Sequence, residues 1–227
     1  MPVGVIINVL SVFLGGIAGT VLKDRIKDDF KETMNMIFGI ASMGMGITSV
    51  ILMQNMPAVI FSLVAGTAAG IALGIGKHIN GLVGKLTGGN ASPELLTVIV
   101  LFCTSGTGIY GALVEGMSGD PSILIAKSIL DFFTAMIFAC SLGKTVSFIA
   151  VPQCVIMMAL FFLAGVILPH ATDAMINDFK ACGGLIMIAT AFRILKLKMI
   201  PTADMLPAMI LVMPLSWLWV TAILPLL

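Results

Sequence analysis

The chain has 227 residues, of which 59% are hydrophobic and 10% charged, and its formal net charge is +1. Soluble domains carry about 25% charged residues, and a mean hydropathy of +1.14 is too high for one soluble core. This composition excludes a sizeable soluble domain and gives no indication of nucleic-acid binding. We therefore expect an integral membrane protein that has the lipid bilayer as its main partner.

Long unbroken apolar runs favour membrane-spanning helices over a β-barrel, because barrel strands alternate and need aromatic girdles. Each helical span needs about 20 apolar residues, and the runs bounded by charges, Gly or Pro predict eight spans. No basic segment precedes the first run, so we expect it to remain as a span. The chain is thus predicted to be an all-α, single membrane domain (1–227), with spans at 3–22, 34–53, 57–76, 94–116, 121–142, 146–168, 181–196 and 206–226. The span from 181 is the shortest, and we expect it to extend toward Asn177.

The basic residues are distributed unevenly between the predicted loops. Of the 12 Lys and Arg residues, ten follow odd-numbered spans, Lys180 follows an even-numbered span, and Lys127 falls inside span five. Because cytoplasmic loops are enriched in Lys and Arg, this asymmetry predicts that both termini are extracytoplasmic. It also favours an even number of spans.

The two ends of the chain resemble each other in one register. Three short matches, at an offset of 149 or 150 residues, pair 13–17 with 162–166, 29–31 with 178–180, and 56–58 with 206–208. They predict a 3+3 repeat of spans one to three (1–76) and six to eight (146–227). An odd number of spans separates equivalent starts, so the two copies have opposite orientation. Inverted repeats are typical of secondary transporters and some channels; the alternative is a duplication retained only for packing.

The central hairpin, residues 94–142, lies outside the repeat and contains the most polar part of span four. Ser105 is about 18 Å below Pro93 along a helix, near the centre of a ~30 Å hydrocarbon core. A helix broken here would present carbonyls and hydroxyls to an ion. The alternative is close packing of small residues. The candidate residues are Thr104, Ser105, Gly106, Thr107 and Gly108.

Span five carries two charged residues and a hydroxyl on one helical face, since Lys127, Asp131 and Thr134 are spaced i, i+4, i+7. Asp131 is about 15 Å below Pro121, again near the midplane. Each charge at a helix centre costs roughly 2.5–3.5 kcal/mol. A self-neutralising ion pair is one interpretation, but ionisable groups inside a membrane favour a functional site.

Two further carboxylates lie near the outer end of the hairpin. Glu115 ends span four, where it either gates an outer vestibule or lies at the membrane interface. Asp120 precedes Pro121, and this pair favours a helix cap over a ligand-binding role.

No metal-ligand spacing and no nucleophile–base pair is present, and the four cysteines fit packing positions. We therefore expect neither an enzyme nor a bound cofactor, apart from a coupling ion, Na⁺ or H⁺. Small residues at Gly66, Gly70 and Gly74, and at Gly15 and Gly19, predict close helix contacts, either within the subunit or across a homodimer. We expect a homodimer.

Residues 1–8 and above all 101–143 resemble an uncharacterised bacterial family of multi-pass membrane proteins, the YqgA/YdfK type, domain of unknown function 554. The similarity is carried by the motifs 102–108, 119–122 and 127–134. It implies a bacterial inner-membrane protein of a family loosely described as transporters, and it supplies neither a substrate nor site residues.

Taken together, these features predict a small secondary transporter, or ion-coupled carrier, of a small solute or ion. The hairpin would form its site and the inverted repeats its scaffold. A passive channel of the same architecture and a non-transporting accessory or sensor subunit are the alternatives. The sequence does not identify the solute or the sign of its charge.

Overall fold

In a computed structural model, the described residues are 1–226 except 24, 87–94, 96–97, 100–101 and 104. These residues form helices and connecting loops, and no strand is assigned among them. Seven of the helices are long and apolar enough to cross a membrane. The expected all-α membrane fold is therefore confirmed. The expected span 94–116 falls partly outside the described residues, so the eighth span stays a prediction.

In chain order, the helices of the described residues begin with α1 and end with η4. Their bounds are α1 (Val3–Leu22), α2 (Asp28–Val50), α3 (Met56–Leu73), α4 (Ile75–Leu86), α6 (Gly106–Ser118), α7 (Ser122–Leu142), α8 (Thr145–Phe148), α9 (Ala150–Ile167), η1 (Leu168–His170), α10 (Asp173–Ile194), η2 (Thr202–Met205), α11 (Leu206–Leu218), η3 (Trp219–Ile223) and η4 (Leu224–Leu226).

Span seven begins earlier than the expected start at 181 and its expected extension toward Asn177, because α10 begins at Asp173. The hydroxyl of Thr172 accepts a hydrogen bond from the Met175 N–H at 3.3 Å and so caps the first turn. Asp178 and Lys180 therefore lie within the helix and not in an outer loop. The apolar run starts late because these two charges interrupt it, whereas the helix start is set by the cap.

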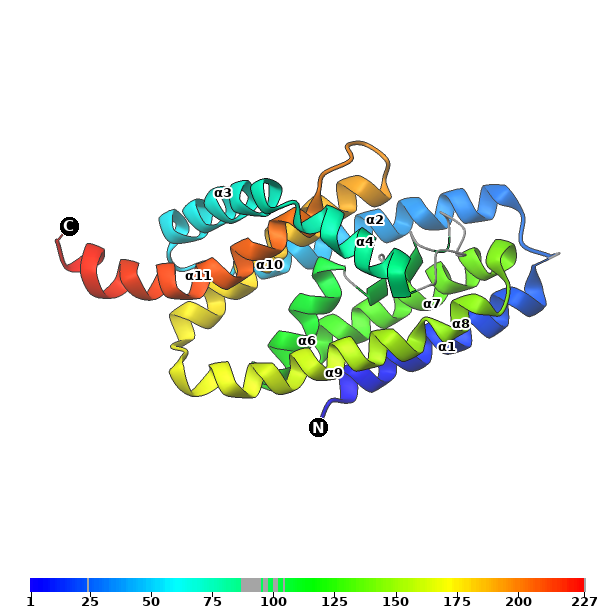
Figure 1. Ribbon diagram of the computed structural model, residues 1–227, viewed down its shortest axis with the longest axis horizontal. Helices are drawn as coiled ribbons and strands as arrows, with labels where there is room; N and C mark the ends of the chain where they lie inside the picture. Colours follow the sequence, from blue (N-terminus) through cyan, green and yellow to red (C-terminus); the bar gives the residue numbers. More distant parts are fainter. Residues whose placement is uncertain (24, 87–94, 96–97, 100–101, 104, 227) are drawn as a thin grey trace. The chain divides into compact units, whose positions relative to one another are not determined.

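The chain divides into two compact units. Unit 1 comprises Met1–Phe38 and Asn80–Val166, and unit 2 comprises Gly39–Ile79 and Ile167–Leu227. In unit 1, α1 and α7 run parallel and side by side (Figure 1). The two helices are in close contact, since a Cβ atom added at Gly15 or Gly19 would collide with a backbone carbonyl of α7. The α8–α9 segment runs in the opposite direction along α1. Its Gln153 meets Asn8, and Ser147 meets the later Gly16.

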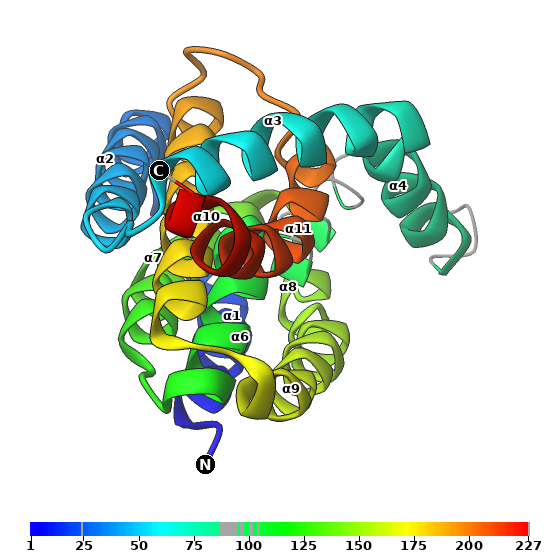
Figure 2. The same cartoon turned by 90° about the vertical axis from the view of Figure 1, so that its left-hand side faces the viewer.

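In unit 2, α3 and α11 run antiparallel (Figure 1) and lie side by side (Figure 2). A Cβ at Gly66 would collide with Ala208, and one at Gly70 with the backbone of Asp204. The small-residue face of α3 is thus used for contacts within the chain. Gly74 instead ends α3 in the left-handed conformation, with φ of 62°.

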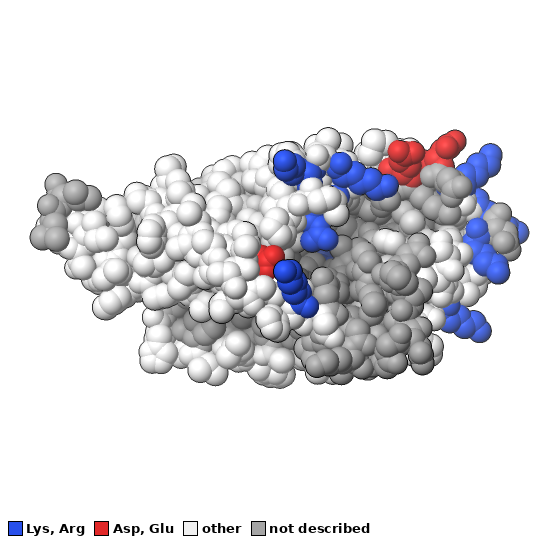
Figure 3. Space-filling model, turned by 45° about the horizontal axis from the view of Figure 1, so that its top comes forward, with Lys and Arg blue, Asp and Glu red and all other residues white. Residues whose placement is uncertain are grey.

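The exposed side chains of the spanning helices are large and apolar, among them Ile60, Phe61 and Val64 on α3 and Phe162 and Leu163 on α9. Figure 3 shows that the surface over the C-terminal part of α11 and the adjoining α3 carries no charged side chains. Apolar surface of this extent is unusual in a soluble monomer and suits contact with lipid. It is consistent with a multi-pass location in the membrane.

We expect Gly19→Ala to destabilise unit 1, because the added methyl group meets the Met136 carbonyl of α7. Overpacking of this kind costs typically about 1–3 kcal/mol. Gly165→Ala is the matched control. Its added methyl group meets nothing within 4 Å, and Ala favours a helix over Gly by about 1 kcal/mol. Thermal unfolding in detergent should show a lower midpoint for the first variant only; equal midpoints would contradict the α1–α7 contact.

Candidate functional site

A buried ion pair lies in the middle of α7. Asp131 is nine residues after the first residue of α7, or about 14 Å along the helix axis. Lys127, one turn earlier, donates from Nζ to Oδ2 of Asp131. The two residues are only 4% and 8% exposed. Asn8 of α1 donates from Nδ2 to the same carboxylate oxygen at 2.9 Å. The pair expected from the i, i+4 spacing is therefore joined to a second helix.

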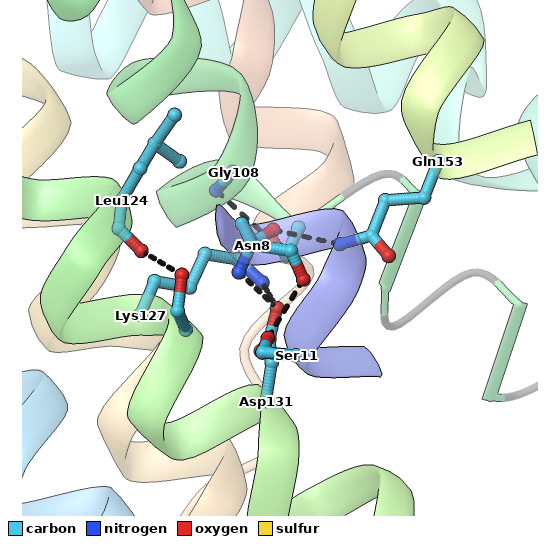
Figure 4. Close-up of polar contacts among 9 residues, drawn as sticks. Asn8, Ser11, Gly108, Leu124, Lys127, Asp131 and Gln153 are labelled. Atoms are coloured by element: carbon cyan, nitrogen blue, oxygen red, sulfur yellow. Dashed lines mark hydrogen bonds and ion pairs between the residues drawn. The ribbon is translucent and has the colours of Figure 1, made fainter. Parts of the chain in front are cut away.

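The network continues to a third helix through Asn8 (Figure 4). Its Oδ1 accepts a hydrogen bond from Nε2 of Gln153, on α9, at 2.8 Å. An ionised carboxylate only accepts, so Asn8 must present its amide N–H group to Asp131 and its carbonyl to Gln153. This leaves Oε1 of Gln153 buried without a hydrogen-bond partner among the described residues. Figure 4 shows this oxygen pointing away from Asn8.

Buried apolar side chains lie on both sides of this polar layer along the helices. One cluster contains Val5, Ala112, Leu124 and Met157. The other includes Val12, Ala135, Ala139, Val146 and Ile149. Each of the three helices has the same order in its own sequence: apolar, polar, apolar. The sets are Val5–Asn8–Val12 on α1, Leu124–Asp131–Ala135 on α7, and Met157–Gln153–Ile149 on the α8–α9 segment, where Ile149 directly precedes α9.

The first turn of α6 packs beside Lys127. At Ser105 the backbone is extended (φ −65°, ψ 133°), and its hydroxyl accepts the Gly108 N–H at 3.1 Å, so α6 begins anew at Gly106. A Cβ added at Gly108 would lie 3.3 Å from Cε of Lys127. The Phe102 ring centroid is 6.0 Å from Nζ of Lys127, within the range of a cation–π contact. Thr107 is buried in this turn, and Thr104 lies outside the described residues.

Glu115 contacts the N-terminal end of α1 rather than the ion pair of α7. Its carboxylate accepts the backbone N–H groups of Gly4 at 2.7 Å and Val5 at 3.1 Å. The residue before α1 is Pro2, which provides no side-chain cap, so Glu115 caps this helix from α6. A negative charge at a helix N-terminus is stabilised by the helix dipole. Leu124 contacts the first turn of α1 at Gly4. The apolar cluster that contains Leu124 and Val5 therefore lies along α1 between the Glu115 cap and Asn8.

The remaining two predicted residues lie outside the network. Asp120 is exposed, and its Oδ1 accepts the Ser122 N–H at 2.9 Å at the start of α7. This contact spans two residues just before α7, whose N-cap position is Pro121 without a side-chain cap, so the capping role expected of Asp120 stays a prediction. Thr134 is half-buried on α7 and takes no part in the hydrogen bonds of the described network.

Unit 2 contains a buried carboxylate that sequence reasoning missed. Asp178 is fully buried. Its Oδ1 accepts the N–H groups of Gln54 and Asn55 at 2.8 and 2.9 Å. Its Oδ2 accepts Nδ2 of Asn55 at 2.8 Å and the hydroxyl of Ser216 at 2.7 Å. Asp178 therefore joins α10 to the start of α3 and to α11, with its charge satisfied by neutral donors.

Sequence signals for the missed residues exist but are weak. Gln153 is an amide inside a long apolar run, and Asp178 follows six residues after the Thr172 cap. A polar side chain in such a position needs a partner. The neighbouring sequence does not identify the helix that supplies this partner. Among the described residues, no group of three or more His, Cys, Asp or Glu side chains is placed to hold a metal ion.

The fold and this site define a multi-pass α-helical membrane protein with an ion pair buried inside one of its spans. Residues 3–217 match the family described as "Protein of unknown function (DUF554)", and the chain belongs to that family.

Two relatives cover nearly the whole chain. The "Uncharacterized protein YqgA" of Escherichia coli (strain K12) is 46% identical over 230 residues, covering 96% of this chain and 98% of the relative. The "Uncharacterized membrane protein YdfK" of Bacillus subtilis (strain 168) is 25% identical over 214 residues, covering 92% and 93%. No solved structure matches the chain.

Two buried serines should respond oppositely to replacement by alanine. Ser216→Ala removes a hydrogen bond to the charged Asp178, and such bonds contribute about 1.5–3 kcal/mol. The hydroxyl of Ser147 is buried without a partner among the described residues, so Ser147→Ala should leave stability unchanged or raise it. Thermal unfolding of both variants checks this. Equal losses would mean that the Asp178 cluster contributes no more than ordinary packing.

Proposed function

We propose that the chain is a small proton-coupled secondary transporter, with Lys127 and Asp131 as the groups that bind the coupling proton and face the solute. The observation that carries the proposal is the position of the ion pair. Each charge at the centre of a span costs roughly 2.5–3.5 kcal/mol, and buried pairs often return little net stability. A pair retained there, and linked to α1 and α9, favours a function over a purely structural role.

The apolar clusters on both sides of the pair favour a carrier over a passive channel. A channel in its conducting state needs a continuous polar or wet path. Here Leu124 and Val5 lie on one side of Asn8 and Asp131, and Val12 and Ala135 on the other. A polar layer closed on both sides is what an alternating-access cycle requires in its occluded state.

The donors around Asp131 favour H⁺ over Na⁺ as the coupling ion. The carboxylate oxygen Oδ2 already receives the Lys127 ammonium and the Asn8 amide. These two donors, one of them a cation, occupy the place that a metal cation would need, whereas protonation of Asp131 requires no cage of oxygen ligands. A proton on Asp131 would weaken its attraction for Lys127 and release that ammonium toward a solute.

The directions of the helices support the proposed inverted repeat. Equivalent helices of the two copies run antiparallel wherever they meet: α1 and α9 in unit 1, and α3 and α11 in unit 2. In unit 2 the later part of α2 also runs antiparallel to α10, since Gly39 meets Leu195 and Gly46 meets Ile188. Because the basic residues are distributed unevenly between the loops, we propose that both termini are extracytoplasmic. The exposed apolar faces of the helices support a homodimer. The protein would move its solute without changing it chemically.

Transport should depend on the ion pair. Wild-type protein in proteoliposomes on a solid-supported membrane is exposed, under a pH gradient, to Na⁺, K⁺, ammonium, small carboxylates and amino acids. At least one solute should produce a saturable current. Asp131→Asn should reduce it to the level of protein-free liposomes, because the proton acceptor is lost. Ser128→Ala is the control, since its hydroxyl donates to the Leu124 carbonyl of its own helix.

A second variant separates transport from folding. Asp131→Asn combined with Lys127→Met removes both charges, so no unpaired charge remains buried. We expect this double variant to unfold at or above the wild-type temperature and still to produce no current. Normal currents in both variants would reject the site. An unsaturable current would indicate a channel, and silence of the wild type across the panel would favour an accessory subunit.

A further inference from the structure

One end of unit 2 gathers basic side chains from three segments. Arg193 lies in the last turn of α10, Lys196 and Lys198 in the loop that follows, and Lys77 in the first turn of α4. The segments are tied together, since Arg193 donates to the Thr202 hydroxyl at 2.9 Å. Asp204, two residues later, accepts the N–H of Gly76 at 2.7 Å.

The carboxylate of Asp204 is thus engaged at the start of α4, and cationic groups are in excess at this end of unit 2. Figure 3 shows several Lys and Arg side chains around one acidic side chain over the end of α3 and the loop after α10. A surface of this charge is complementary to anionic groups.

Lys196 occupies a backbone conformation that favours glycine. Its φ is 56°, and among the described residues it is the one residue other than glycine with a positive φ. The N–H groups of Lys196 and Leu197 bond the carbonyls of Arg193 and Phe192, both at 3.0 Å, as in a Schellman helix end, where this position is usually Gly. A lysine here costs backbone energy that glycine would not, and such outliers suggest a function for the side chain.

The loop alternates basic and apolar residues that are all exposed. Leu197, which lies between the two lysines Lys196 and Lys198, is 66% exposed. Met199, which follows Lys198, is 73% exposed. Exposed apolar side chains at the end of a spanning helix suit the acyl boundary of a bilayer, and lysines beside them reach the phosphate level. A site for free phosphate would not need the apolar side chains, so the alternation favours a lipid surface.

We propose that the loop 195–200, with Arg193 and Lys77, is a binding site for anionic phospholipid headgroups in the adjacent leaflet. The lysines contact the phosphates, while Leu197 and Met199 enter the acyl boundary. The site is separate from the ion pair of unit 1 and does not depend on the transport proposal.

The full chain, purified in mild detergent, is incubated with phosphatidylglycerol, and retained lipids are counted by native mass spectrometry. The variant K196Q/K198Q should bind phosphatidylglycerol about thirtyfold more weakly, because each basic residue near an anionic surface contributes about a factor of five. Lys144→Gln, which removes one lysine charge from unit 1, should bind as the wild type does. Phosphatidylcholine should show no difference between the proteins.

Lys196→Gly provides the sharpest comparison. It relieves the left-handed backbone and should unfold at or above the wild-type temperature, yet bind phosphatidylglycerol about fivefold more weakly. The proposal is overturned if K196G and K196Q/K198Q retain the lipid as the wild type does, or if Lys144→Gln loses it equally. It is also overturned if inorganic phosphate displaces the lipid completely, which would indicate a site for the free anion.

Discussion

The carboxylate of Asp131 constrains the rest of unit 1. A charge halfway along a spanning helix has no water to solvate it, so the protein must supply every partner. Lys127 supplies the opposite charge from the same helix, and Asn8 supplies an amide from α1. Asn8 in turn requires Gln153 on α9. One acidic residue thereby fixes the facing sides of three helices, and the glycines of α1 allow the close approach to α7 that brings Asn8 within reach.

Three buried carboxylates are satisfied in different ways. Glu115 and Asp178 accept backbone N–H groups next to the starts of α1 and α3, where the peptide dipoles favour a carboxylate. Both act as caps between helices. Among the described residues, the hydrogen-bond partners of Asp131 are the side chains of Lys127 and Asn8. In the transport cycle that we propose, Asp131 is the carboxylate that accepts the proton.

Local features of the site could be predicted from the sequence, and long-range ones could not. The Lys127–Asp131 pair follows from the i, i+4 spacing on one helix. Asn8 pairs with Asp131 across 123 residues of sequence, and helical periodicity contains no information about such partners. Asp178 was placed in a loop because hydropathy treats a charge as the end of a span, although four donors satisfy it inside the protein.

The central claim is that the Asp131 layer opens alternately to the two sides of the membrane. In a chain lacking its four native cysteines, Leu124→Cys and Ala135→Cys place single thiols on either side of that layer on α7. The account predicts that membrane-impermeant reagents modify them from opposite sides, and that a pH change which increases one reaction decreases the other. An exposed control, Asp120→Cys, should react from the Leu124 side throughout. Reaction of both thiols from the same side, or of neither at any pH or with any solute, would contradict the account.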